Sequence, residues 1–570
     1  MGIERSVVDP LRVSRKDFVR MGGLGVAAVV LGVEATADRA FADPRFSSNP
    51  FTLGVASGDP LPDGFVLWTR LLTAGGEMPN RKVRVHWKVA TEENMKTVVK
   101  KGEAFTGPDR GYSVHVDVRG LKSDRDYYYR FRVGDYVSPV GRTRTTPGFG
   151  ASPAALAFAF VSCQDYQNGF YAAYGAMARQ EQDLDFVVHL GDYIYEYGPS
   201  ETAVPGREHN GPEIITLADY RKRHALYKAD EDMREAHRLF PFIVTFDDHE
   251  VENNYADAIP EEGSETPKRE DFLRRRAAGY KAYYENMPLR PSSMPQGPDM
   301  RLYRRISYGD LAQFSVLDTR QYRTNQPCGD GFTERCARAL SDRQTMTGPE
   351  QERWLKDGMN RSRARWNIAA QQTMLAEYDF SAVPDGQPNG QPNGQLFNMD
   401  QWDGYVAARN RLIGFFDRSN VQNPITLTGD IHSAWVHDLK TDFSDETSKT
   451  VGTEFVGTSI TSSFPGVFIP VVEGARPDNP HTKFFDGANR GYTRCDLNRQ
   501  RYLTTFKAVP TEPGQGSVVT PEAASTTLAA FVVENGRPGA SKVEGPTTPT
   551  SSTQGEIDQG YKRLTARDNW

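Results

Sequence analysis

Long hydrophobic runs are missing from this 570-residue sequence, in which no segment reaches the roughly 18 uncharged apolar residues of a membrane-spanning helix. An excess of basic residues is missing too, since 68 Lys and Arg face 74 Asp and Glu and the formal net charge is -6. This balance argues against a specific nucleic-acid partner. The 38% apolar and 25% charged fractions fit a soluble globular protein. We expect a monomer without a transmembrane anchor.

Signatures of several common enzyme classes are also missing. The chain has no G-x-S-x-G nucleophile elbow and no GK[ST] phosphate-binding loop. The stretch DHEVENN has Asn253 where an H-E-x-x-H metalloprotease needs its second histidine. Serine hydrolases, P-loop enzymes and metalloproteases of that type are therefore disfavoured.

Cysteine is scarce, with four residues in the whole chain. Cys328 and Cys336 bracket the polar loop CGDGFTERC, and this close spacing predicts a disulfide in an exported protein. Cys163 and Cys495 are then left unpaired. A free thiol in an oxidising compartment needs a reason, such as burial or metal binding.

The N-terminus, residues 1–42, has the form of a secretion signal. An apolar run over Met21–Val33 is too short to span a membrane and is followed by the cleavage pattern at residues 40–42, Ala-Phe-Ala. The stretch SRKDFVR resembles a twin-arginine export signal, although Lys16 stands where the second arginine belongs. We expect a secreted protein that leaves by the twin-arginine route.

The mature chain divides by its pattern of apolar residues. Short alternating strands separated by Gly, Pro and Asp predict a β-sandwich over residues 43–150, and its end resembles a fibronectin type III domain. After a linker at 147–153, strands alternate with helices over residues 151–532, which predicts a layered α/β domain. Residues 533–570 are rich in Gly, Pro, Ser and Thr and are expected to form a tail.

Four predicted core strands end in side chains that can bind metal. They are VSCQD with Cys163 and Asp165, GDYIY with Asp192 and Tyr195, FDDHE with Asp247, Asp248, His249 and Glu250, and TGDIHS with Asp430 and His432. A single Asp after a strand is most often a turn or cap residue. Four such endings in one α/β segment instead predict a shared site, because ligands bind where the carboxyl ends of strands meet. Carboxylate, imidazole, thiolate and phenolate together suit several metal ions.

These motifs carry a family resemblance. The series GDYIY, DDHE and GDIH is similar to that of calcineurin-like metallophosphoesterases, and longer stretches such as FTLGVASGDPLPDGFVLWTRL and LTGDIHSAWVHD resemble the alkaline phosphatase D family. The resemblance extends from Phe51 to beyond Thr461. It implies a central β-sandwich flanked by helices behind the N-terminal sandwich.

The same resemblance implies a centre with one Fe³⁺ and two Ca²⁺. Its implied metal ligands are Cys163, Asp192, Tyr195, Asp248, Asn254, Asp430 and His432. Asp192 would bridge iron and calcium. Asp248 and Asp430 replace neutral ligands of the wider superfamily with hard anionic oxygen, as calcium requires.

The implied reaction is hydrolysis of phosphate monoesters and diesters, with His249 and Asp192 as catalytic residues. Arg320 and Arg323 in DTRQYR are additional candidates for binding phosphate. Small esters, teichoic acid and phospholipids stay open as substrates, and a phospholipase D type of activity is an alternative. A non-catalytic secreted adhesion protein is a second alternative, which the predicted N-terminal sandwich favours and the metal-binding motifs disfavour.

Overall fold

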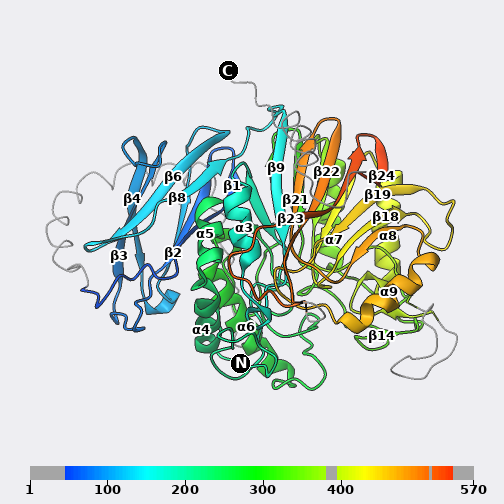
Figure 1. The fold of residues 1–570 in the computed structure, drawn as a ribbon, viewed down its shortest axis with the longest axis horizontal. Coiled ribbons are helices and arrows are strands. Elements are labelled where there is room, and N and C mark those ends of the chain that lie inside the picture. Colours follow the sequence, from blue (N-terminus) through cyan, green and yellow to red (C-terminus); the bar gives the residue numbers. More distant parts are fainter. Residues whose placement is uncertain (1–44, 381–394, 513–515, 544–570) are drawn as a thin grey trace, which may run out of the picture.

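The computed structural model of the protein describes residues 45–380, 395–512 and 516–543. Two large sheets face each other, helices cover both outer faces, and a smaller β-sandwich lies at one end (Figure 1). The predicted secretion signal lies outside the described residues. Within the described ranges, no helix is both long and apolar enough to cross a membrane.

The first large sheet is built around three parallel strands, β9 (Ala155–Val161), β10 (Phe186–His189) and β11 (Pro241–Val244). All three are fully apolar or nearly so, as strands buried on both faces must be. In space the order is β24-β23-β22-β21-β9-β10-β11-β1-β2-β5. The remaining strands are β1 (Val55–Leu61), β2 (Gly64–Arg70), β5 (Ser113–Val118), β21 (Arg490–Asn498), β22 (Arg501–Val509), β23 (Thr526–Glu534) and β24 (Arg537–Lys542).

The second large sheet has the order β12-β13-β15-β17-β19-β18-β20. Its strands are β12 (Arg304–Tyr308), β13 (Ala312–Val316), β15 (Trp366–Ala370), β17 (Pro424–Thr428), β18 (Ala434–Lys440), β19 (Thr450–Val456) and β20 (Thr482–Asp486). One core fills the space between the sheets, where Phe158 and Phe186 of the first sheet pack on Phe314 of the second. The layered α/β fold with a central sandwich is thereby confirmed.

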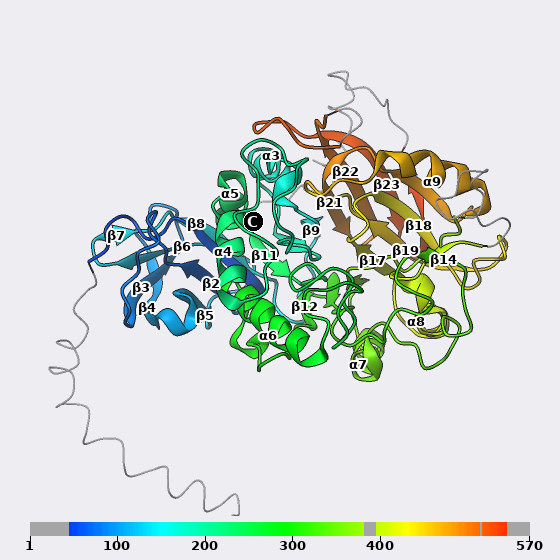
Figure 2. The same ribbon diagram turned by 90° about the horizontal axis from the view of Figure 1, so that it is seen from below.

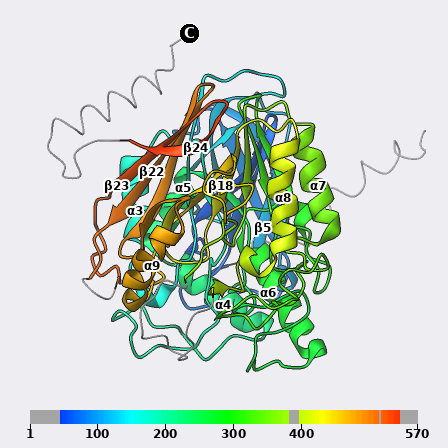
Figure 3. The same cartoon turned by 90° about the vertical axis from the view of Figure 1, so that its right-hand side faces the viewer.

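Helices complete the outer layers. The first sheet is covered by α3 (Ala172–Gln180), α4 (Leu217–Lys228), α5 (Glu231–Leu239) and α6 (Arg269–Asn286). The second is covered by α7 (Gly348–Asn360) and α8 (Val406–Arg418), which lie on the same side of the molecule (Figure 3). The sequence did not predict α6, because its buried face carries charged residues such as Arg275, which pairs with Glu213 and Glu252.

The N-terminal sandwich shares a sheet with the rest of the protein. Its strands β1, β2 and β5 extend the first large sheet, because β1 pairs in parallel with β11. Facing them are β3 (Val83–Ala90), β4 (Val98–Thr106), β6 (Arg125–Val133), β7 (Tyr136–Val137) and β8 (Gly141–Thr145), with an apolar core between. The linker at residues 147–153 therefore separates two segments of the chain but not two separate sheets (Figure 2).

Two local predictions can be compared with the structure. The disulfide between Cys328 and Cys336 is confirmed, and it lies beside a small ribbon of β14 (Phe332–Thr333) and β16 (Phe397–Asn398). The tail predicted from residue 533 is wrong at its start, because β23 and β24 continue the first sheet to Lys542. Gly and Pro in β24 are tolerated since it is an edge strand. Residues 544–570 lie outside the described residues.

Candidate metal centre

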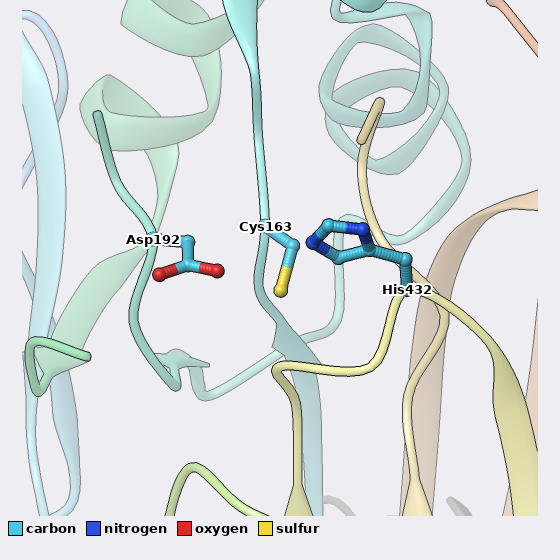
Figure 4. Close-up of side chains that lie close together, drawn as sticks. All are labelled: Cys163, Asp192 and His432. Carbon is cyan, nitrogen blue, oxygen red and sulfur yellow. The ribbon is translucent and has the colours of Figure 1, made fainter. Parts of the chain in front are cut away.

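The four ligand-bearing loops meet at one place, at the carboxyl ends of strands from both large sheets. Cys163 follows β9, Asp192 follows β10, Asp248 follows β11 and Asp430 follows β17. Groups of candidate ligand atoms lie within 4.8 Å of one another in three sets: Cys163, Asp192 and His432; Asp192, Asp248 and His249; and Asp247, Asp248 and Asp430. Figure 4 shows the first set converging from separate loops. Since consecutive sets share Asp192 or Asp248, the three form one continuous centre.

The backbone at these positions is unusual. Cys163 and Asp192 both have φ of 57°, Asn254 has 50°, Asp430 has 64° and His432 has 54°. This left-handed conformation is uncommon for residues other than glycine, and such outliers concentrate at functional sites. Each loop therefore turns sharply after its strand and directs a side chain toward the centre.

Tyr195 joins the first ligand set. Its hydroxyl lies 3.1 Å from Asp192 Oδ2 and 3.1 Å from His432 Nε2, and it accepts a hydrogen bond of 2.8 Å from Ser462 Oγ. The other nitrogen of His432, Nδ1, lies 3.1 Å from the carbonyl oxygen of Ser463. A backbone carbonyl at Nδ1 leaves Nε2 free for a ligand bond.

Asn254 lies at the edge of the centre. Its backbone N–H donates to Asp248 Oδ2 at 2.7 Å, while its side-chain amide donates to Asp330 Oδ2 at 3.4 Å. The structure thus brings all seven predicted ligand residues and His249 together.

The donor atoms are arranged as a cation would require. Asp192 Oδ1, Asp247 Oδ2 and Asp248 Oδ1 are buried and have no hydrogen-bond partner among the described residues. Burial and the neighbouring carboxylates raise the pKa of the Cys163 thiol and the Tyr195 hydroxyl well above their usual values. The ionised forms of these buried groups are costly unless they are paired with a cation or coordinate a metal. The donor set therefore fits bound metal ions.

His249 borders the same centre. Its Nδ1 lies 2.7 Å from Glu196 Oε2, and its ring lies against that of Tyr195 with centroids 4.1 Å apart. Burial alone would lower the pKa of His249, but the charges of Glu196, Asp248 and Asp192 more than offset this and raise it well above its usual value. Glu196 therefore orients the imidazole. No motif indicated this glutamate.

The expectation that Arg320 and Arg323 bind phosphate is contradicted by their surroundings. Both side chains are buried, and neither lines the cavity at the centre. Arg320 donates to Asp247, to Asp400 at 3.0 Å and to Asp430 at 2.8 Å. Arg323 pairs with Asp400 as well. These arginines therefore balance the charge of the carboxylates instead of facing a substrate.

Glu250 is one of the predicted metal-binding candidates in FDDHE. In the structure its carboxylate instead binds backbone N–H groups of two loops. Its carboxylate accepts hydrogen bonds from the backbone N–H groups of Asp192 at 3.2 Å, Tyr193 at 2.7 Å and Asp247 at 2.8 Å. It thereby links the loop after β10 to the loop after β11. Gln401, which no motif marked, supports Asp430 by donating from Nε2 to Oδ2 at 2.5 Å.

The metal centre forms the polar side of a cavity of about 390 Å³. The apolar part of the lining includes Phe332, Phe380, Trp435, Phe464, Phe468 and Val472, which we call the aromatic wall. Phe332 contacts Phe380 and Phe468, with ring centroids 4.9 Å and 6.1 Å apart. Among the described residues that line the cavity, none is Lys or Arg.

Comparisons with known proteins agree with the motifs. Residues 158–506 match the family described as PhoD-like phosphatase, and residues 35–147 match its N-terminal domain. Alkaline phosphatase D of Bacillus subtilis (strain 168) is 46% identical over an alignment of 548 residues, and the match covers 94% of this chain and 90% of that protein. The solved "Structure of PhoD" has a TM-score of 0.81 and 43% identity, and the match covers 92% of this chain and 100% of that one. With this coverage in sequence and structure, the chain belongs to the PhoD-like phosphatase family.

Proposed function

We propose that the protein is a secreted, metal-dependent phosphodiesterase that also hydrolyses phosphate monoesters. The observation that carries the preference for diesters is the lining of the cavity, which combines an anionic metal-binding side with the aromatic wall and has no Lys or Arg among its described residues. A monoester dianion needs more cationic contacts than a diester, which carries one negative charge and can place its second ester group on an apolar surface. Family membership favours this enzyme over a non-catalytic adhesion protein.

The identity of the metals is part of this proposal. Fe³⁺ would be held by Cys163, Asp192, Tyr195 and His432, and two Ca²⁺ by Asp192, Asp248, Asp430 and Asn254. Thiolate and phenolate suit ferric iron, whereas carboxylate and amide oxygens suit calcium. When bound, these ions supply positive charge that offsets the phosphate and activates water.

His249 and Asp192 are the proposed catalytic residues. His249 borders the cavity, and its Nδ1 is hydrogen-bonded to Glu196, which fixes the ring. Nε2 is then available to donate a proton to the leaving oxygen. Asp192 belongs to two ligand sets and would hold them at a constant separation. Its second oxygen, Oδ2, accepts from Tyr195, which keeps the carboxylate oriented.

A matched pair of substrates tests the preference. Bis(4-nitrophenyl) phosphate and 4-nitrophenyl phosphate share a leaving group and differ in a second, aromatic ester group. We expect kcat/KM to be at least about tenfold higher for the diester at pH 8. Removal of metal by a chelator should abolish both activities.

The aromatic wall provides the variant for this test. Phe468→Ala should lower kcat/KM for the diester roughly fivefold, in line with about 1 kcal/mol for an aromatic contact, and leave the monoester within about twofold. Phe149→Ala is the control, because Phe149 is 80% exposed and does not line the cavity. A preference for the monoester, or an equal loss on both substrates in the Phe468 variant, would contradict the proposed function.

Cleavage of phospholipid head groups is the second candidate, and the aromatic wall favours it because acyl chains are apolar. Choline release from monomeric dihexanoylphosphatidylcholine, compared with glycerophosphocholine, separates lipids from small polar diesters. Release from the lipid alone would support the phospholipase D type of activity, and release from neither would restrict the enzyme to other esters.

Export by the twin-arginine route remains a proposal that rests on residues 1–42. Its motif departs from the usual pattern at Lys16. The buried centre supports the route, because metal held at the ends of strands from two sheets is best inserted as the protein folds, before export. If blocking the general secretory pathway alone prevented export, this route would be excluded.

A further inference from the structure

A second concave surface lies on the N-terminal sandwich, on the face that β4, β3 and β6 turn away from its core. Along β3 the buried residues alternate with exposed or half-buried ones, so Arg84, His86 and Lys88 share the outer face. On β6 the same alternation places Arg130 and Arg132 outward. In Figures 1 and 2 these strands lie at the opposite end of the molecule from α8 and α9 (Ile469–Ala475).

Three cations stand in a row across this face. In the strand register, Lys88 of β3 lies directly opposite Lys101 of β4 and directly opposite Arg130 of β6. Like charges directly opposite each other destabilise a sheet. In the described part of the chain, none of the three makes an ion pair with a carboxylate. We define Lys88, Lys101 and Arg130 as the cationic row.

Among the described residues that line the groove, Glu103 is the one that is acidic, and it is already engaged. Glu103 stands beside His86, whose Nδ1 lies 3.3 Å from its Oε1, and Arg84 Nη1 lies 3.9 Å from the same oxygen. Slight burial and the charge of Arg130 lower the pKa of Lys88, as expected for a cation with positive neighbours. The positive charge of the row is therefore not offset within the sheet.

The row lies in a groove of about 830 Å³. Besides the cationic row, the lining of the groove includes His86, Trp87, Lys100, Glu103, Arg132 and the aliphatic side chains of Val98, Val99 and Val137. The three valines are 39%, 41% and 42% exposed, which is unusual for this residue type. A cationic centre with apolar edges is suited to a chain whose charged groups alternate with less polar ones.

We propose that this groove binds a linear phosphodiester polymer and does not cleave it. Neighbouring strands lie about 4.8 Å apart, so the cationic row spans roughly 10 Å, which exceeds a single phosphate group. A concave surface fits a single chain better than a flat membrane. The groove has no cluster of metal-binding residues among those described, so its role is binding alone.

This site would hold a polymeric substrate on the enzyme. Binding at a second site raises the local concentration of phosphodiester bonds near the catalytic centre, without a change in the chemistry there. The net charge of -6 for the whole chain hides this local concentration of positive charge. The role in holding substrate rests on the proposed function, whereas binding to the groove can be measured without turnover and is tested separately.

Fluorescence anisotropy tests the proposal on the full-length, metal-loaded protein. The probe is a fluorescein-labelled, single-stranded 15-mer of thymidine with phosphorothioate linkages, which resist hydrolysis. We expect the triple variant Lys88→Ala, Lys101→Ala, Arg130→Ala to raise Kd at least about tenfold at 50 mM NaCl. The slope of log K against log[NaCl] should become shallower by about two. Each phosphate contact releases about 0.7 counterion when a single strand binds, and the variant loses three such contacts. Removing like charges should not unfold the sheet.

A matched control carries the same change in net charge elsewhere. Arg274→Ala, Lys449→Ala, Lys483→Ala removes three surface cations that already pair with carboxylates, and its Kd should match that of the unaltered protein. Hydrolysis of bis(4-nitrophenyl) phosphate should be unchanged in both variants. Equal Kd values for the two triple variants would overturn the proposal. Two other results would also overturn it. One is loss of probe binding when inorganic phosphate saturates the catalytic centre. The other is binding to phosphatidylglycerol vesicles without binding to the probe.

Discussion

Individual residues of the candidate metal centre are held in a conformation that only their surroundings can maintain. A left-handed φ at Cys163, Asp192 or Asp430 costs on the order of 1 kcal/mol or more at each position. The cost is offset by hydrogen bonds such as that from the Cys163 N–H to the Gly191 carbonyl at 3.1 Å. Gly191 itself leaves no room for a side chain, since a Cβ there would lie 2.5 Å from Asp247 Cβ.

Cys163 offers the clearest test at this scale. Cys163→Ser replaces a thiol with a much less acidic hydroxyl, so we expect at least about tenfold weaker retention of the proposed iron, measured by elemental analysis after dialysis. Activity should fall in proportion to the iron content. Cys495→Ser is the matched control, because Cys495 is also free and buried but lies in β21 away from the ligand sets.

Thiol labelling provides a second readout for Cys163. A thiolate bound to metal is a poor nucleophile, so a thiol reagent should modify Cys163 only after the metal is removed. Rapid labelling without loss of iron, or a disulfide from Cys163 to Cys495, would show that the thiol is not a ligand. Mass spectrometry of the intact protein distinguishes these results.

At the scale of elements, the helices behind the first sheet bury charged groups that support the site from outside. Lys228, the last residue of α4, is 2% exposed, and its Nζ donates to Tyr193 Oη at 2.9 Å. The same atom lies 4.5 Å from the ring of Trp68. Burial, with a smaller effect from Arg70, lowers the pKa of Lys228 to about 7.

This lysine predicts a pH-dependent stability difference. Between pH 7 and the unfolded pKa of about 10.4, the unfolded chain binds more protons at Lys228 than the folded protein, so this group makes stability rise with pH. Lys228→Met removes this contribution to the slope. The free energy of unfolding of the variant minus that of the unaltered protein should therefore fall by roughly 3 kcal/mol from pH 7 to pH 10. Urea denaturation at several pH values measures it.

The control for Lys228→Met is Lys449→Met, since the Lys449 side chain is 66% exposed. That change should leave the shape of the stability curve against pH unaltered. Parallel curves for Lys228→Met and the unaltered protein would show that the buried amine titrates normally.

At the scale of the whole molecule, the N-terminal sandwich and the catalytic part share one sheet. Ser57 and Gly58 of β1 pair with Pro241 and Phe242 of β11. Side chains reinforce this junction, because Trp68 Nε1 donates to the Glu285 carbonyl at 3.0 Å. An unpaired β11 would expose a sheet edge and apolar surface.

Deletion tests this continuity. A chain of residues 151–570 should fail to give soluble, folded protein, because β11 becomes an edge strand and the contacts of α6 with β2 and β5 are lost. The control is the full chain with a protease site inserted at residues 147–153. After cleavage, we expect the two fragments to stay together in gel filtration and retain activity. A stable, active fragment 151–570 would contradict the shared-sheet interpretation.

The sequence by itself determined the features that local patterns encode. Apolar runs marked β9, β10, β11 and β17, and the side chains after them, from Cys163 to His432, meet in the structure as expected. Parallel strands bring their carboxyl ends to one edge, so strand order in the chain was enough to predict the meeting point. The disulfide of Cys328 and Cys336 followed from spacing and compartment in the same way.

Only the tertiary structure decided which charged groups face the cavity and which are buried to balance charge. The stretch DTRQYR suggested Arg320 as a phosphate ligand. In the structure Arg320 instead donates to Asp247, Asp400 and Asp430, which come from three distant segments. The cationic row likewise depends on the register of three strands, because Lys88, Lys101 and Arg130 lie on separate strands and the chain as a whole has a net negative charge. Periodicity reports which face of an element is apolar. It does not report which distant carboxylate will neutralise a given arginine, since that depends on long-range packing and the cost of burying an unpaired charge.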